Sequence, residues 1–227
     1  MRRLVALVFV ALLPACSGSS TPAPAPAPGA QPAPGATGTQ AQSKPRIVFL
    51  GDSLTAGLGL PSAESYPSLI GKRLKEQGLD YEIVNAGVSG DTSAGGLRRL
   101  DWSLEGDVKL LIVALGANDG LRGLPPVELK KNLAAVLERA KTEGVPVLLA
   151  GMEAPPNNGP EYTREFRNVY VELAKEYNVR FIPFLLQGVA GDASLNQADG
   201  IHPNTRGAEI VADIVWKELG PMLGRQN

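Results

Sequence analysis

From Arg46 onward, short apolar runs alternate with longer stretches in which apolar and polar residues repeat with helical spacing. The short runs are rich in β-branched and bulky residues, as in the buried strands of a parallel sheet. They predict strands at 46–50, 81–85, 110–115, 145–150 and 179–183. The longer stretches predict helices at 66–77, 127–142, 162–177 and 205–219.

The most regular helical pattern lies at 127–142, where the apolar positions are Leu129, Leu133, Val136, Leu137 and Ala140. Gly78 and Gly144 each follow one of these stretches, as glycines that end helices do. Strand–helix alternation implies a parallel sheet covered on both faces. We therefore expect an α/β fold, a flavodoxin-like three-layer α/β/α sandwich with a central parallel five-stranded sheet.

The N-terminal region follows a different pattern. Met1-Arg2-Arg3 precedes an apolar run at 4–13, which is too short to span a bilayer and has the layout of a secretory signal peptide. The segment Leu13-Pro14-Ala15-Cys16 resembles a bacterial lipobox, although Pro14 is unusual there. This resemblance implies cleavage before Cys16 and lipidation of its thiol. The alternative is an ordinary cleaved signal that leaves a free thiol.

Residues 17–44 contain mainly Ser, Thr, Pro, Ala, Gly and Gln, and they offer almost no apolar bulk to bury. We expect a disordered tether, extended by its prolines, between a lipoprotein signal at 1–16 and a folded domain at 45–227. A lipid on Cys16 would anchor the chain in a membrane. Ser17, in place of an acidic residue, favours the periplasmic side of a bacterial outer membrane.

Composition excludes several classes of protein. A net charge of −1 and a pI near 5.9 give no basic surface for nucleic acid. One Cys cannot form an internal disulfide, and one His and one Cys leave only carboxylates as further metal ligands. We therefore expect no metal and no cofactor, and any imidazole chemistry depends on His202. The sequence carries no signal for an oligomeric state.

Candidate chemistry begins where the first predicted strand ends, at Gly51-Asp52-Ser53-Leu54. Open α/β sheets bind their ligands at the carboxyl ends of the strands, so Ser53 is a candidate nucleophile. The alternative is that Ser53 only caps a following turn or helix.

Two further strand ends carry candidate groups. Gly90 lies in a Gly-rich segment whose backbone N–H groups are free to bind an anion. Asn118, in Gly116-Ala117-Asn118-Asp119, supplies an uncharged amide that suits a developing oxyanion. For each segment a plain turn is the alternative, because Gly, Asn and Asp dominate turns.

Asp199 and His202 lie three residues apart near the C-terminus. The Asp carboxylate can accept a hydrogen bond from one ring nitrogen, which leaves the other free to act as a base toward a Ser. The alternative is a structural or surface histidine.

Together, Gly-Asp-Ser-Leu, Gly90, Gly-x-Asn-Asp and Asp-x-x-His resemble the blocks of the SGNH (GDSL) hydrolase superfamily, in the same order and at the same strand ends. Their local sequences are similar to those of the bacterial thioesterase I/lysophospholipase and arylesterase group. The resemblance implies a Ser-His-Asp triad of Ser53, His202 and Asp199. It also implies an oxyanion hole formed by the N–H groups of Ser53 and Gly90 and the amide of Asn118.

The resemblance further implies a substrate-binding loop directly after Asn118, formed by Leu121, Arg122, Gly123, Leu124 and Pro125. The loop at 152–160 is expected to form the opposite wall. The predicted activity is hydrolysis of aryl or acyl carboxylic esters, with lysophospholipids and acyl thioesters as further substrates of the same chemistry.

Two alternatives remain open. One is a carbohydrate or peptidoglycan O-acetylesterase with the same triad, for which a shallow polar cleft is expected. The other is a tethered binding module without catalysis, against which the five intact positions argue.

Overall fold

The computed structural model describes residues 44–224 and contains one parallel sheet of five strands in the order β2-β1-β3-β4-β5. The strands are β1 (Arg46–Gly51), β2 (Glu82–Gly87), β3 (Val108–Ala114), β4 (Val147–Ala150) and β5 (Arg180–Ile182). All five predicted strands form, and the predicted α/β sandwich is confirmed. The predicted signal peptide, Cys16 and residues 17–43 of the tether predicted at 17–44 lie outside the described residues.

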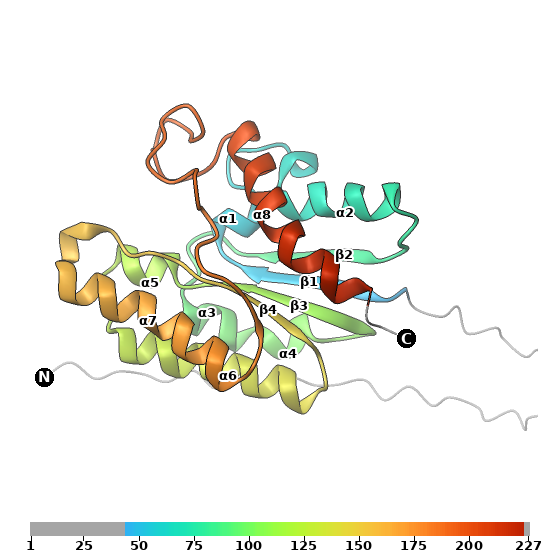
Figure 1. Ribbon diagram of the computed structural model, residues 1–227, viewed down its shortest axis with the longest axis horizontal. Coiled ribbons are helices and arrows are strands. Elements are labelled where there is room, and N and C mark those ends of the chain that lie inside the picture. The colour runs from blue at the N-terminus through green and yellow to red at the C-terminus, as the bar shows by residue number, and fades with distance from the viewer. Residues whose placement is uncertain (1–43, 225–227) are drawn as a thin grey trace, which may run out of the picture. The chain divides into compact units, whose positions relative to one another are not determined.

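Helices cover both faces of the sheet (Figure 1). On one side lie α2 (Tyr66–Glu76) and α8 (Thr205–Leu223), and on the other α3 (Ser93–Arg98), α6 (Pro126–Thr142) and α7 (Pro160–Glu176). Shorter elements complete the fold, namely α1 (Ser53–Ala56), η1 (Ser62–Glu64), α4 (Leu100–Ser103), α5 (Ala117–Leu121) and η2 (Pro156–Asn158). Within residues 44–224, no helix is both long and apolar enough to cross a membrane.

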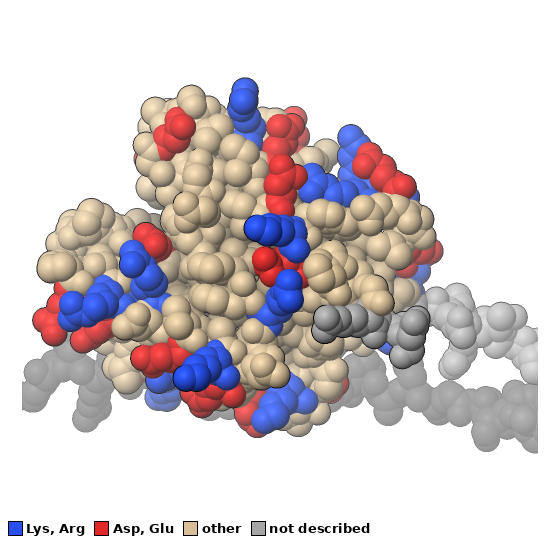
Figure 2. Space-filling view, in the orientation of Figure 1, with Lys and Arg blue, Asp and Glu red and all other residues tan. Residues whose placement is uncertain are grey.

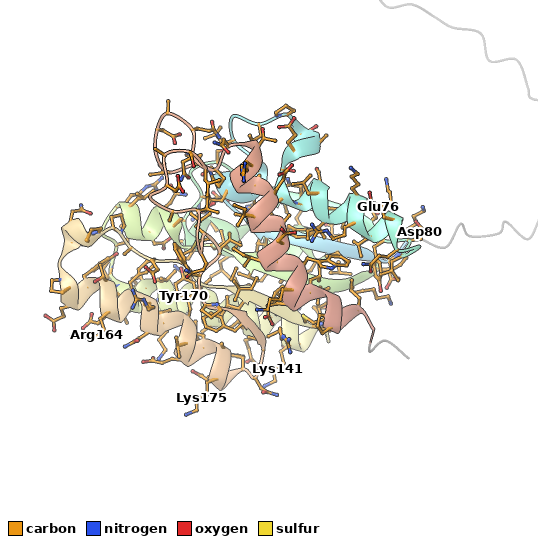
Figure 3. The ribbon with its side chains drawn as sticks, turned by 45° about the horizontal axis from the view of Figure 1, so that its top comes forward. Glu76, Asp80, Lys141, Arg164, Tyr170 and Lys175 are labelled. Atoms are coloured by element: carbon orange, nitrogen blue, oxygen red, sulfur yellow. The ribbon has the colours of Figure 1, made fainter. Side chains whose placement is uncertain are left out.

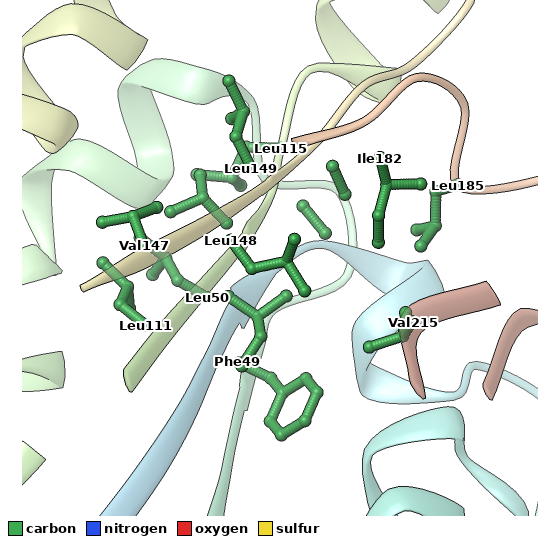
Figure 4. Close-up of a cluster of buried hydrophobic side chains, with 14 of the residues drawn as sticks. Phe49, Leu50, Leu111, Leu115, Val147, Leu148, Leu149, Ile182, Leu185 and Val215 are labelled. Carbon is green, nitrogen blue, oxygen red and sulfur yellow. The ribbon is translucent and has the colours of Figure 1, made fainter. Parts of the chain in front are cut away.

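The core lies between these layers. Strands β1, β3 and β4 are almost continuously apolar and buried, because parallel strands are covered on both faces. Figure 4 shows side chains of these strands gathered with Ile182, Leu185 and Val215. Full burial of one such side chain contributes roughly 1.5–3 kcal/mol, so the sheet forms a rigid support for the loops at its ends.

Helix α7 illustrates how the outer layer is fixed. Figure 3 shows Arg164 and Lys175 pointing outward from this helix, whereas Tyr170 lies in the interior. The Tyr170 hydroxyl donates to the carbonyl of Leu115 at 3.0 Å. A Cβ on Gly116 would lie 2.0 Å from that hydroxyl oxygen, so glycine is required at this position, two residues after the end of β3. On the face drawn in Figure 2, acidic and basic side chains are intermingled.

The observed bounds differ slightly from the predicted ones. Strand β4 begins at Val147 rather than 145, because Pro146 has no N–H to donate to a neighbouring strand. Helices α6 and α7 begin at Pro126 and Pro160, because proline is favoured in the first turn of a helix. Helix α8 continues past the predicted end at 219 and includes Pro221.

The strand order places the candidate residues. The chain leaves β1 for β2 on one side and later returns to β3 on the other side of β1. Such a reversal opens a crevice at the carboxyl ends of the strands. Gly51 is level with Gly87 of β2 and Ala114 of β3, so the segments bearing Ser53, Gly90 and Asn118 leave the sheet at the same edge.

Candidate active site

Ser53 is the first residue of α1, on a tight turn directly after β1. Asp52 caps this helix through its side chain, which accepts from the backbone N–H of Leu54 at 3.0 Å. Gly57 ends the helix with a left-handed φ of 75°. Ser53 is thus held at the switch point of the sheet, with 8% of its surface exposed.

The Ser53 hydroxyl lies within hydrogen-bond reach of the single histidine. Ser53 Oγ is 2.8 Å from His202 Nε2, and His202 Nδ1 is 2.7 Å from Asp199 Oδ2. With Nδ1 protonated toward Asp199, Nε2 is the acceptor for the serine proton. These distances fit a nucleophile, a base and an orienting carboxylate.

Asp199 is held as a carboxylate by its own loop. Its Oδ1 accepts from the backbone N–H groups of His202 and Ile201, each at 3.0 Å. These bonds and the one to the His202 ring lower the pKa of Asp199 to about 2. The carboxylate is therefore charged at neutral and mildly acidic pH.

The loop that carries this pair is anchored to the turn that follows α1. Gln197 N donates to His202 O at 2.8 Å, and the Gln197 side-chain amide donates to Leu58 O at 2.7 Å. The buried Asn196 amide donates to Val189 O at 2.6 Å and braces the same loop from within. His202 is thereby fixed relative to Ser53 although 149 positions separate them.

The two other candidate oxyanion donors lie on the loops after β2 and β3. Gly90 has φ 83° in the turn that the Asp91 N–H closes onto Val88 O at 3.1 Å. The Asn118 amide donates to Asp91 O at 2.9 Å and lies 3.4 Å from Asp52 Oδ2. The turn around Gly90 and the Asn118 side chain are therefore directly connected.

Asp52 is an ionisable residue of the site for which the sequence predicted no role. Its carboxyl is fully buried, and desolvation raises its pKa from 3.8 to about 6, against the lowering effects of the Leu54 N–H, His202 and Asn118. The position of Asp52 at the start of a helix indicates its hydrogen bond to Leu54 N, but nothing in the local sequence indicates that its carboxyl is buried.

Asp119 is a second buried carboxylate in the site. It accepts from Ser93 N at 2.8 Å and from Ser93 Oγ at 2.6 Å, and Asn132 donates to Ser93 Oγ at 2.9 Å. These bonds connect the start of α3 to α5 and α6. They hold together the two segments that carry Gly90 and Asn118.

A cavity of about 490 Å³ opens beside Ser53 and His202. Its apolar lining comes from α1, α5 and the segments after β4 and β5, and includes Leu54, Ala117, Leu121, Met152, Ala154, Pro155, Pro156, Phe184, Leu186, Ala190 and Ile201. The polar side chains among the lining residues are those of Ser53, Asn118, Glu153 and His202. Such a cavity suits an apolar chain attached to one reacting polar group.

The five residues predicted to bind substrate occupy different places. Leu121 lines the cavity and is half exposed. Arg122 Nη2 donates to Gly90 O at 2.9 Å, and Gly123 lies close to Asn158. Leu124 O accepts from Tyr162, and Pro125 precedes α6. Of the five residues, only Leu121 is among those that line the cavity.

The loop at 152–160, predicted to form the opposite wall of the substrate site, lines the cavity with part of its length. Residues 152–156 of the loop at 152–160 line the cavity. The segment 184–191 forms a third wall that the sequence analysis did not assign to the site. Only Phe184, Leu186, Ala190 and Gly191 of that segment contribute, and their apolar character is the sole local signal for it.

This fold and site define a hydrolase of the Ser-His-Asp type on a flavodoxin-like α/β sandwich. Residues 49–210 match the GDSL-like lipase/acylhydrolase family. The chain belongs to this family and is an ester hydrolase.

Several characterised proteins are similar in sequence to this chain over nearly their whole length. Esterase TesA of Pseudomonas aeruginosa is 44% identical, over 82% of this chain and 92% of its own length. An arylesterase of Vibrio mimicus is 37% identical, over 79% and 90%. The thioesterase 1/protease 1/lysophospholipase L1 of Escherichia coli is 34% identical, over 83% and 89%. The crystal structure of TesA superposes with a TM-score of 0.75, covering 78% of this chain and 99% of that one.

Proposed function

We propose that the protein is a serine esterase that hydrolyses carboxylic esters with apolar acyl groups through an acyl-enzyme, with Ser53 as the nucleophile. The observation that carries this proposal is the Ser53–His202–Asp199 chain of hydrogen bonds, at 2.8 and 2.7 Å, at the end of an apolar cavity.

The reaction follows from this geometry. His202 Nε2 takes the Ser53 proton as Ser53 Oγ attacks the ester carbonyl carbon, and Asp199 stabilises the imidazolium that forms. The carbonyl electron pair moves to oxygen, where the N–H groups of Ser53 and Gly90 and the Asn118 amide stabilise the charge. The tetrahedral species collapses as His202 returns the proton to the leaving alkoxide. Water then attacks the acyl-enzyme with His202 as base, which releases the acid and restores Ser53.

The cavity lining supports acyl or aryl esters over sugar acetates. Its walls are mainly apolar, whereas an O-acetylesterase of polysaccharides needs polar groups for the sugar hydroxyls. The names of the relatives extend the proposal to lysophospholipids and acyl thioesters, whose carbonyls undergo the same attack. A binding module without catalysis does not need a base and an orienting carboxylate within 3 Å of each other, so the His202–Asp199 pair beside Ser53 favours the esterase.

The N-terminal sequence supports a lipid-anchored location on the periplasmic side of the outer membrane. The basic start, the apolar run and Cys16 carry this part of the proposal. Mass spectrometry of the full chain expressed in a bacterium should find acyl groups on Cys16. A mature chain that begins elsewhere, or carries an unmodified Cys16, contradicts it.

The activity is tested with p-nitrophenyl esters from acetyl to long acyl chains, on the wild type, Ser53→Ala and the exposed-serine control Ser62→Ala. We expect hydrolysis by the wild type and the control, loss in Ser53→Ala, and a preference for chains longer than acetyl. Hydrolysis that survives in Ser53→Ala contradicts the mechanism. Activity restricted to acetylated sugars favours the O-acetylesterase.

A further inference from the structure

Arg99 lies behind the active site, between α3 and α4, and its guanidinium uses all three of its nitrogen atoms. Nη1 donates to Ala86 O and Nη2 to Gly51 O, each at 2.6 Å, and Nε donates to Asp91 Oδ2 at 2.7 Å. The side chains of Arg99 and Asp91 are only 17% and 19% exposed. One planar group thus joins the end of β1, the end of β2 and the turn after β2.

Two of these acceptors, on Gly51 and Asp91, lead to the three oxyanion donors. Gly51 is two residues before Ser53, whose N–H is one donor. Asp91 directly follows Gly90, whose N–H is the second. The backbone carbonyl of Asp91 accepts from Asn118 Nδ2 at 2.9 Å, so the residue held by Arg99 in turn orients the third.

The surrounding sequence leaves room for this contact. A Cβ on Gly95 would lie 2.5 Å from Asp91 Oδ1, so a side chain there would displace the carboxylate from Arg99. The adjacent Arg98 is exposed and makes none of the contacts described for Arg99. The planar fork of arginine is needed here, because the three N–H donors of a lysine ammonium all lie on one nitrogen and cannot replace three nitrogens that each reach a different acceptor.

We propose that Arg99 is a positioning residue for the oxyanion hole, acting through Asp91 on Asn118 and through Gly51 and Ala86 on the strand ends that carry Ser53 and Gly90. This inference rests on the proposed esterase function. Donors preorganised toward the developing oxyanion stabilise the transition state more than the bound ester. Loss of Arg99 therefore affects kcat more than KM.

The test is a double-mutant cycle on a short p-nitrophenyl ester with Arg99→Lys, Asn118→Ala and the combined variant. Because a displacement of about 1 Å can cost about a hundredfold in rate, we expect Arg99→Lys to lower kcat roughly 10–100-fold with KM nearly unchanged. Because the two residues act on one oxyanion, the loss should be at least about fivefold smaller when Asn118 is already Ala. The control Arg98→Lys should keep the wild-type kcat.

A purely structural role for Arg99 gives a different result. It would lower the melting temperature and the amount of active protein, and its effect on kcat would be the same with and without Asn118. If Arg99→Lys does not fold, Asp91→Asn, which removes the ion pair and keeps the Asp91 carbonyl, enters the same cycle. Equal losses in both backgrounds overturn the inference for either variant.

The wild type and Ser53→Ala are measured in parallel. An active wild type beside an inactive Ser53→Ala establishes the esterase on its own, so equal losses in the cycle then contradict only the role of Arg99. An inactive wild type contradicts the esterase and this inference together.

Discussion

Replacement of Asp52 by asparagine should remove part of the pH dependence of the protein's stability, so that the variant gains stability relative to the wild type as the pH rises. Burial raises the pKa of Asp52 from 3.8 to about 6, because the charged carboxylate loses its hydration. The folded state therefore binds this proton more tightly than the unfolded state does. Stability is greatest when Asp52 is protonated and falls as the pH rises from about 4 through 6.

The shift of about two pKa units corresponds to about 3 kcal/mol of unfolding free energy when the carboxylate is fully charged. Integration of the two titrations places about 2 kcal/mol of this loss between pH 4.5 and pH 7.5. The Asp52→Asn variant has no such titration, and its amide oxygen can still accept from Leu54 N. Its stability relative to the wild type should therefore rise by about 2 kcal/mol over that interval.

The assay is urea unfolding of both proteins at pH 4.5, 6.0 and 7.5. Groups that titrate alike in both proteins cancel in the difference, and Asp199 does not contribute because its pKa of about 2 lies below the interval. If the difference in unfolding free energy between variant and wild type is the same at all three pH values, the reasoning from the burial of Asp52 is refuted.

Three further predictions concern the site and its support. Asn118→Ala should lower kcat on a short aryl ester by about 10²–10³-fold with little change in KM, because one oxyanion donor is lost; an unchanged kcat removes Asn118 from that role. Leu121→Ser should lower kcat/KM for long acyl esters more than for acetyl esters, because Leu121 lines the cavity; an equal effect on both places the acyl chain elsewhere. Tyr170→Phe should lower the unfolding free energy by about 1 kcal/mol in urea titrations, because Leu115 O loses its donor; no change means that water replaces the hydroxyl.

The strands and long helices were predictable because their signals are local. Periodicity in α6 identified the five side chains that the structure buries, Leu129, Leu133, Val136, Leu137 and Ala140. The helix that carries Ser53 has only four residues and the one that carries Asn118 only five, too few for a periodic pattern to emerge. Each depends instead on contacts with distant segments.

The candidate triad was predictable because its residue types are rare or ordered along the chain, with a single His and an Asp three residues before it. The supporting residues were not. Arg99 and Gly51 are 48 positions apart, and Asp119 and Ser93 are 26 apart, so no local pattern marks their hydrogen bonds. The turn motif around Gly90 indicated free N–H groups, but it did not indicate that the Arg99 guanidinium holds the turn through Asp91.

The substrate loop shows the limit of carrying positions over from a resemblance. Leu121 follows Asn118 on α5 and points to the cavity, whereas Arg122 turns to Gly90 O. The direction of each side chain depends on the helical turn of α5 and on the partners beyond it. The wall at 184–191 comes from a segment that follows β5, whose place beside β4 depends on the sheet order.

The most direct measurement is mass spectrometry of the enzyme after brief reaction with an ester or a serine-directed phosphonate, followed by peptide mapping. We expect the reaction to add one acyl or phosphonyl group per chain, on the peptide that contains Ser53, and to add none to Ser53→Ala. Reaction of the reagent with another residue in place of Ser53, or turnover of the ester by Ser53→Ala at the wild-type rate, would contradict Ser53 as the nucleophile.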